Sequence, residues 1–184
     1  MAGLKCKWGR LICQLHSKSL CGKVVTGVQM NIEYTSGSIE LLNIIQPLWE
    51  KLNQYHEQIS PYFKEDFHAN TFELRKSKLS RRYGHGQLRV DLAYQNDNLV
   101  GYCISGIDQD GIGEIESIFI AEEFRGQNVG EALMQHALHS LNDQGVTSKV
   151  IDVAVGNERA FKFYARFGFF PRVTKLKQKG GDIA

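Results

Sequence analysis

The chain has 184 residues, of which 42% are apolar and 10% aromatic, and this is enough for one domain with one sizeable core. Twenty-two Lys and Arg residues stand against 20 Asp and Glu residues, so the net charge of +2 lacks the basic excess of a nucleic-acid-binding protein. No apolar run approaches the roughly 20 residues of a membrane-spanning helix. We therefore expect neither nucleic-acid nor membrane partners.

The four cysteines, Cys6, Cys13, Cys21 and Cys103, form no CxxC pair, and the histidines do not take the spacing of metal ligands. No metal site is predicted, and a reduced cytoplasmic compartment is the expected location. Cys103 lies in the apolar run NLVGYCISGI, where a small thiol packs like other hydrophobic side chains. We expect it in the core and not as a nucleophile.

Residues 1–29 form a basic segment without acidic residues and without a sustained helical or strand period. An organellar presequence or a tethering arm has such a composition, but a second methionine, Met30, directly precedes the strand-like NIEYT. We interpret residues 1–29 as a leader outside the native domain, residues 30–178 as one domain, and residues 179–184 as a flexible tail.

After this first strand, apolar residues at spacings of three and four predict a helix from Ser36 to about Leu52. A second amphipathic helix is expected from about Pro61 to Ser80, where YGHG ends it. Three β-rich runs follow, QLRVDLAY, NLVGYCISGI and IGEIESIFI. The residues Gln95-Asn96-Asp97 join the first two runs as an antiparallel hairpin, and all three should be neighbours in one sheet.

The clearest helix follows AEEFRGQNVG, because apolar residues from Val129 to Leu141 repeat with the helical period until Gly145 ends it. SKVIDVAV is then predicted as a buried strand, Asn157 as the cap of a helix that reaches about Phe167, and FFPRVTKLK as a last strand. This order predicts a mixed sheet flanked by helices, with the segment 112–155 as its parallel unit.

The turn RGQNVG, residues 125–130, lies between an apolar strand and the clearest helix. The first N–H groups of a helix have no intrahelical partner and lie at the positive end of its dipole. Small residues at this place let a pyrophosphate approach the backbone. The turn alone is a common pattern, but a dinucleotide enzyme is disfavoured because the chain lacks GxGxxG after its first strand and a repeated βαβ half.

The next helix carries NERAFKFYARFGF, residues 157–169. Strand, R-G-x-x-x-G, helix, strand and N-x-x-A-x-x-F-Y-x-x-x-G-F together resemble the acetyl-CoA-binding half of the GNAT superfamily of N-acetyltransferases over residues 114–172. Residues 30–113 agree with it only in element order. The family's turn reads Q or R, x, x, G, x, then G or A. Asn128 replaces the inner glycine here, and Asn is one of the few other residues that tolerate a positive φ.

The resemblance implies an α/β (α+β) fold with a mixed, mostly antiparallel sheet, in which the strands IESIFI and VIDVAV diverge into a wedge for acetyl-CoA. It implies that the co-substrate binds without a metal. The backbone contacts would come from two stretches, with Asn157 adding a bond to the pantetheine arm: Ile118, Phe119 and Ile120 of the strand, and Arg125, Gly126, Gln127, Asn128, Val129 and Gly130 of the turn. An N–H group of the strand would also polarise the thioester carbonyl.

Two side chains are candidates for the proton transfers. Glu116 lies where the family often places a carboxylate that takes the amine proton, and Glu114 on the same face is an alternative. A salt bridge would also explain Glu116, because a carboxylate in an apolar strand needs a partner. Tyr164 matches the family tyrosine that protonates the leaving thiolate, although simple packing beside Phe163 would also place an aromatic residue there.

The function expected from this resemblance is direct transfer of an acetyl group from acetyl-CoA to a primary amine of an unidentified small molecule or peptide. The alternative is an acyl-CoA-binding regulatory domain without significant catalysis, because fold does not secure function. Many family members have two strands after the second helix, whereas only FFPRVTKLK is available here. A partner subunit could cover the resulting sheet edge, which makes a homodimer possible.

Overall fold

The computed structural model describes residues 31–84 and 87–179, so the predicted leader lies outside the described residues. Five strands form one sheet in the order β1-β2-β3-β4-β5. The first four strands are antiparallel neighbours and β5 is parallel to β4, which confirms the predicted mixed, mostly antiparallel sheet. The strands are β1 (Glu33–Gly37), β2 (Leu88–Gln95), β3 (Asn98–Ile107), β4 (Gly113–Ile120) and β5 (Lys149–Val150).

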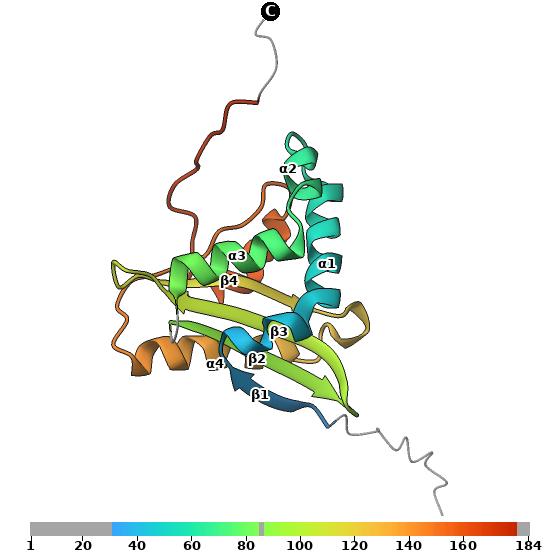
Figure 1. The fold of residues 1–184 in the computed structure, drawn as a ribbon, viewed down its shortest axis with the longest axis vertical. Helices are drawn as coiled ribbons and strands as arrows, with labels where there is room; N and C mark the ends of the chain where they lie inside the picture. The colour runs from blue at the N-terminus through green and yellow to red at the C-terminus, as the bar shows by residue number, and fades with distance from the viewer. Residues whose placement is uncertain (1–30, 85–86, 180–184) are drawn as a thin grey trace, which may run out of the picture.

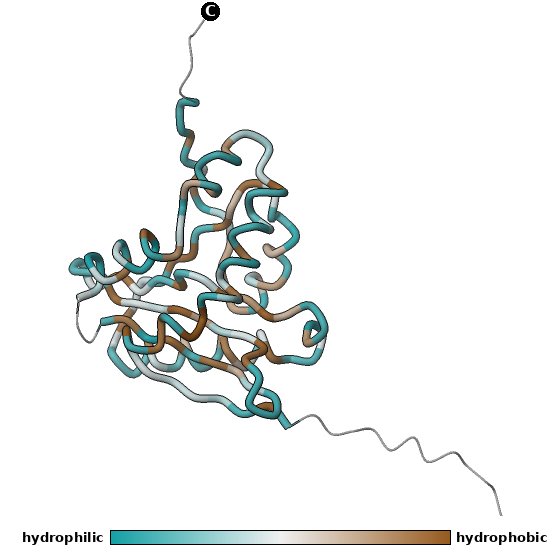
Figure 2. The backbone as a smooth tube through the Cα atoms, turned by 45° about the vertical axis from the view of Figure 1, so that its right-hand side comes forward, coloured by the Kyte–Doolittle hydropathy of each residue, from teal (hydrophilic) through white to brown (hydrophobic). Residues whose placement is uncertain are grey.

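Helices cover both faces of the sheet. Helices α1 (Leu42–Ile59) and α3 (Phe72–Tyr83) pack on one face and α4 (Val129–Asp143) on the other (Figure 1). Hydrophobic residues gather along the strands and on the helix turns beside them, whereas much of the outer helical surface is hydrophilic (Figure 2). The sheet thus separates two hydrophobic cores. The shorter elements are α2 (Lys64–His68), α5 (Phe161–Ala165) and the 3-10 turns η1 (Ile39–Leu41), η2 (Glu122–Phe124) and η3 (Glu158–Ala160).

The predicted hairpin and the core position of Cys103 are confirmed. Strands β2 and β3 pair in antiparallel register, and Asn96 and Asp97 between them have φ values of 48° and 64°. Such left-handed residues give a two-residue turn whose twist matches that of the flanking strands. The Cys103 side chain is fully buried, and burial raises the pKa of its thiol. In the described ranges, no helix has both the length and the apolar composition to cross a membrane.

The second predicted helix is wrong as a single element, because it consists of α2 and α3. Thr71 begins α3 by accepting a hydrogen bond from the Leu74 N–H group at 3.3 Å. The Asn53 side chain of α1 donates to the Phe67 and Asn70 carbonyl groups at 2.8 and 3.3 Å. The break between α2 and α3 is therefore stabilised by a side chain of the preceding helix, 14 and 17 residues away in the sequence.

The last predicted strand, FFPRVTKLK, is also wrong. Residues 169–177 form no strand and run away from the sheet past α2 (Figure 1). A strand requires a partner for its backbone groups, and β5 (Lys149–Val150) is only two residues long, so it offers almost no edge for a further strand. Phe170, Val173 and Leu176 are accordingly 72%, 82% and 89% exposed. The homodimer stays a prediction.

The C-terminal end of α1 contacts the loop that follows β5. Gly156 has a φ of +99°, and a Cβ atom there would lie 2.4 Å from the Ile59 carbonyl oxygen. The Tyr55 hydroxyl group donates to Asn157 Oδ1 at 3.3 Å and accepts a hydrogen bond from Arg159 Nε at 2.8 Å. These contacts hold α1 beside the end of the sheet where β4 and β5 lie.

Replacing Gly156 with Ala should lower the free energy of unfolding by about 3 kcal/mol, because a left-handed backbone and a crowded methyl group each destabilise the fold. Gly111→Ala is the matched control, since its φ is +76° and a Cβ atom would meet nothing within 4 Å. Only the backbone penalty of about 1–2 kcal/mol applies to it. Urea unfolding measures both, and equal losses would contradict the close approach at Gly156.

Candidate functional site

Strands β4 and β5 pair only briefly and then separate. Gly113 lies opposite Lys149 and Glu114 opposite Val150, and the register contains no further pair between these strands among the described residues. The remainder of β4, residues 115–120, therefore has a backbone edge on this side that no strand covers. The predicted divergence of IESIFI from VIDVAV is present. The prediction of SKVIDVAV as a buried strand is wrong, because only Lys149–Val150 forms a strand and Val150 is 40% exposed.

A β-bulge in β4 brings two polar residues to the same wall. Ile104 of β3 lies opposite Ser117, whereas Ser105 lies opposite Ile115, so Glu116 is an extra residue in β4. Strict alternation would turn Glu116 and Ser117 to opposite faces of the sheet. Because of the bulge, both line the space beside β4.

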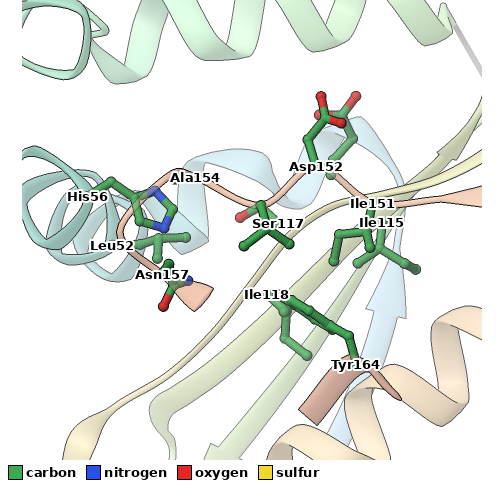
Figure 3. Close-up of a pocket in the computed structure, with 12 residues that line it drawn as sticks. Leu52, His56, Ile115, Ser117, Ile118, Ile151, Asp152, Ala154, Asn157 and Tyr164 are labelled. Atoms are coloured by element: carbon green, nitrogen blue, oxygen red, sulfur yellow. The ribbon is translucent and has the colours of Figure 1, made fainter. Parts of the chain in front are cut away.

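The separation of β4 from β5 opens a pocket with a volume of about 70 Å³ (Figure 3). Side chains of α1, β4, the chain after β5, and α5 line it. His56 reaches toward it from α1, and Tyr164 enters it beside Ile118 (Figure 3). Four of the predicted site residues meet here, namely Glu116, Ile118, Asn157 and Tyr164.

The Glu116 carboxylate is held by three side chains of α3. Its Oε2 atom accepts a hydrogen bond from Arg75 at 2.6 Å, and its Oε1 atom accepts from Arg82 at 3.0 Å and from the Tyr83 hydroxyl group at 2.5 Å. Arg82 also pairs with Glu114 at 2.6 Å. Burial and the neighbouring Glu116 raise the pKa of Glu114. The salt bridge that was one interpretation of Glu116 is therefore observed, and it ties α3 to β4.

Tyr164 combines both interpretations that its position allows. Its ring packs against Phe163 with the ring centroids 5.4 Å apart, and it also lines the pocket. Burial raises the pKa of its phenol to about 12. The phenol is therefore protonated at neutral pH and can donate a hydrogen bond or a proton to an atom in the pocket.

Asn157 does not cap η3 with its side chain, contrary to the prediction. It occupies the N-cap position of this turn, but no side-chain hydrogen bond caps it. Its Oδ1 atom accepts a hydrogen bond from the Tyr55 hydroxyl group at 3.3 Å instead. This orients the amide in the pocket wall and directs the Nδ2 donor away from Tyr55.

The turn before α4 has the backbone shape of an anion-binding loop. Asn128 begins α4 in the left-handed conformation with a φ of 63°, which Asn tolerates better than most residues with a Cβ atom. The Ala132 N–H group donates to the Asn128 carbonyl group at 3.0 Å, so the preceding N–H groups of the turn have no intrahelical acceptor. Gly126 has a φ of +76°, and no atom lies within 4 Å of the place of its Cβ atom.

The side chains of the turn serve the loop itself. Arg125 Nε donates to the Ile120 carbonyl group at 3.1 Å, and Gln127 Nε2 donates to the Glu123 carbonyl group at 2.9 Å. Val129 is buried in the core. A Cβ atom on Gly130 would lie 2.9 Å from Ile120 Cδ1, so glycine lets α4 pack closely on β4. What the turn offers a ligand is therefore its backbone.

In β4, too, the side chains pack in the cores while the backbone remains available to a ligand. Phe119 packs in the core beneath α1 and α3, and Ile118 and Ile120 pack against the core beneath α4. Their backbone groups lie along the edge that β5 leaves uncovered, and the Ile118 side chain also lines the pocket.

Sequence reasoning missed two lining residues of α1, Leu52 and His56, and also Ser117 and Asp152. Helical periodicity identified the buried face of α1 but not which of its turns lies at the end of β4. Ser117 was hidden by the bulge, since alternation alone assigns it to the opposite face. Its Oγ atom lies 2.8 Å from the Tyr102 hydroxyl oxygen.

The family model described as the Acetyltransferase (GNAT) family matches residues 46–169. The chain belongs to the GNAT family. An uncharacterized N-acetyltransferase of Methanocaldococcus jannaschii is 29% identical over 119 residues, which are 59% of this chain and 53% of that protein. A putative [ribosomal protein bS18]-alanine N-acetyltransferase of Bacillus subtilis is 30% identical over 112 residues, 61% of this chain and 66% of that protein. The chain thus spans only about half to two thirds of these curated relatives.

Solved GNAT structures have the same fold. A GCN5-related N-acetyltransferase from Ralstonia eutropha matches with a TM-score of 0.67 and 17% identity, covering 82% of this chain and 100% of that one. The PaiA N-acetyltransferase from Thermoplasma acidophilum, solved with coenzyme A, matches with a TM-score of 0.64 and 19% identity over 79% and 94% of the two chains. At these identities the likeness shows the GNAT fold.

Replacing Asn128 with Ala should destabilise the domain by about 1–2 kcal/mol, because its φ of 63° is unfavourable for residues with a Cβ atom other than Asn and Asp. Asn128→Gly should retain wild-type stability within about 0.5 kcal/mol, since glycine adopts this conformation readily. Both variants are compared by urea unfolding. Equal stability of the Ala and Gly variants would show that the turn does not require a left-handed residue.

Proposed function

We propose that this GNAT domain transfers an acetyl group from acetyl-CoA to a primary amine. The observation that carries the proposal is the uncovered edge of β4, which begins after Glu114 and leads to the turn before α4. An extended chain with amide groups pairs with such an edge as an additional strand does. A pyrophosphate binds at free N–H groups of a helix N-terminus.

The residues present fit the parts of acetyl-CoA. The backbone of Ile118, Phe119 and Ile120 would pair with the pantetheine arm, and Asn157 would add its side-chain amide. The backbone N–H groups of residues 126–130 would hold the pyrophosphate. Asn128 does not prevent this, because it already has the left-handed conformation that the turn requires. The Arg125 side chain would stabilise the loop through its bond to Ile120.

Direct attack of the amine on the thioester carbonyl is the mechanism that we favour, since it requires no acetylated protein side chain. Tyr164 would protonate the departing thiolate, in line with its protonated phenol in the pocket. Positioning and hydrogen bonding to the thioester oxygen would supply the remaining acceleration. Glu116 stays a prediction as the group that accepts the amine proton.

The names of the relatives suggest where a search for the acceptor should begin. The Bacillus subtilis relative is named for the alanine of a ribosomal protein. Another structure of this fold, with a TM-score of 0.57, is an aminoglycoside N-acetyltransferase in complex with CoA. A peptide with a free N-terminal alanine and an aminoglycoside are therefore suitable first probes. A cytoplasmic location remains a prediction.

Acetyl-CoA should stabilise the protein by about 2.7 kcal/mol at a hundredfold excess over its dissociation constant, and NADH should not. A thermal melt measures this shift. Release of free thiol upon addition of the amine probes then distinguishes an acetyltransferase from a domain that binds acyl-CoA without catalysis. No shift at millimolar acetyl-CoA would contradict the proposed function.

Tyr164→Phe should lower kcat by about tenfold to a hundredfold. General acid catalysis contributes about 10²–10⁴ to a rate, and water can replace part of this contribution. The affinity for acetyl-CoA should stay within about threefold, as the phenol is proposed to act on the leaving sulfur. Tyr94→Phe on β2, outside the pocket, is the control and should retain the wild-type kcat. An unchanged kcat in Tyr164→Phe would remove the proposed role.

A further inference from the structure

His56 is the titratable side chain that α1 contributes to the pocket. It belongs to the last turns of α1, and its ring lies between two aromatic rings, with centroid distances of 5.6 Å to Phe67 and 5.8 Å to Tyr55. It reaches from α1 toward the space beside Ser117 and Asn157 (Figure 3). The helix, and not a loop, therefore sets the position of this imidazole.

The imidazole of His56 is also available for chemistry. Within residues 31–84 and 87–179 it takes part in no hydrogen bond or ion pair, and burial is the only influence on its pKa. The Glu116 carboxylate, in contrast, already accepts hydrogen bonds from Arg75, Arg82 and Tyr83. Protonating Glu116 would weaken these bonds in a side chain that is only 5% exposed, whereas protonating His56 breaks none.

We infer that His56 is the general base of the proposed acetyl transfer, and that Glu116 positions α3 against β4. The inference rests on the proposed function. The amine nitrogen forms a bond to the thioester carbonyl carbon and gives a proton to the imidazole, directly or through one water molecule. The carbon–sulfur bond breaks, and the sulfur takes a proton from Tyr164. The imidazolium then returns its proton to the Tyr164 phenolate through solvent, so the net products are an amide and a free thiol.

The protonation state of His56 suits this role. Burial lowers the pKa of its imidazole, so the ring is neutral at neutral pH and can accept a proton. An α-amine has an ordinary pKa of about 7.7–8.0, and therefore a useful fraction of it is unprotonated at the same pH. Titratable groups near His56 include those that line the pocket or neighbour its ring, namely Tyr55, Glu57, His68, Glu116, Asp152, Arg159 and Tyr164.

The test compares His56→Gln with His139→Gln in the full chain. His139 lies on α4 with its side chain 79% exposed and paired with Asp143, outside the pocket. Acetyl-CoA affinity is measured by calorimetry, and kcat by thiol release with the alanine peptide and an aminoglycoside as probes, between pH 5 and 9. His56→Gln should lower kcat by about 100-fold or more and leave acetyl-CoA affinity within threefold. His139→Gln should match the wild type.

The pH profile separates a base from a packing residue. At saturating amine, wild-type kcat should fall only at pH values below the ordinary imidazole pKa of about 6.5, because burial lowers the pKa of His56, and this decline should be missing in His56→Gln. Glu116→Gln should lower stability but keep the decline. A His56→Gln variant with kcat near the wild-type value, or with an unchanged pH profile, would overturn the role of His56 while the transferase stands. A wild-type protein that binds no acetyl-CoA would remove both proposals.

Discussion

The parting of two parallel strands is the constraint on which the rest of the structure depends. β4 and β5 exchange backbone contacts only at Gly113–Lys149 and Glu114–Val150. Beyond them β4 must leave half of its backbone hydrogen-bonding groups without a strand, and such groups are unfavourable unless water or a ligand pairs with them. An extended amide-containing ligand therefore gains affinity from groups that the fold has already aligned, at little entropic cost.

Helices α1 and α3 border this pocket and contribute polar side chains to it and to its surroundings. Arg75 and Arg82 bind Glu116 and so attach α3 to β4. The Tyr55 hydroxyl group and the close approach of Gly156 attach α1 to the loop after β5. Two helices on the same face of the sheet thus fix β4 and the chain after β5 separately. The two guanidinium groups suit Glu116 to a structural role. The His56 imidazole, which has no polar partner among the described residues, is better suited to accept a proton.

Much of the fold follows from local sequence patterns, and the failures have tertiary causes. Asn96 and Asp97, which adopt the left-handed conformation, predict the hairpin. The glycine-rich turn with Asn128 predicts the start of α4. The break between α2 and α3 depends on Asn53 of another helix, and the predicted last strand does not form because β5 is only two residues long and offers it almost no edge. His136 of α4 is exposed and contacts Tyr34 edge-on at 5.1 Å, because it lies at the border of the apolar face of this helix. His56 could not be found from sequence, since only packing shows that the end of α1 reaches β4.

Hydrogen–deuterium exchange with and without coenzyme A tests the central claim most directly, because it reports on backbone amides and requires no acceptor. The account predicts slower exchange at the amides of residues 118–120 and of residues 126–130, with little change in the hairpin of β2 and β3. Protection confined to other segments, or no protection at saturating coenzyme A, would contradict the claim that the uncovered edge of β4 and the turn before α4 form the co-substrate site.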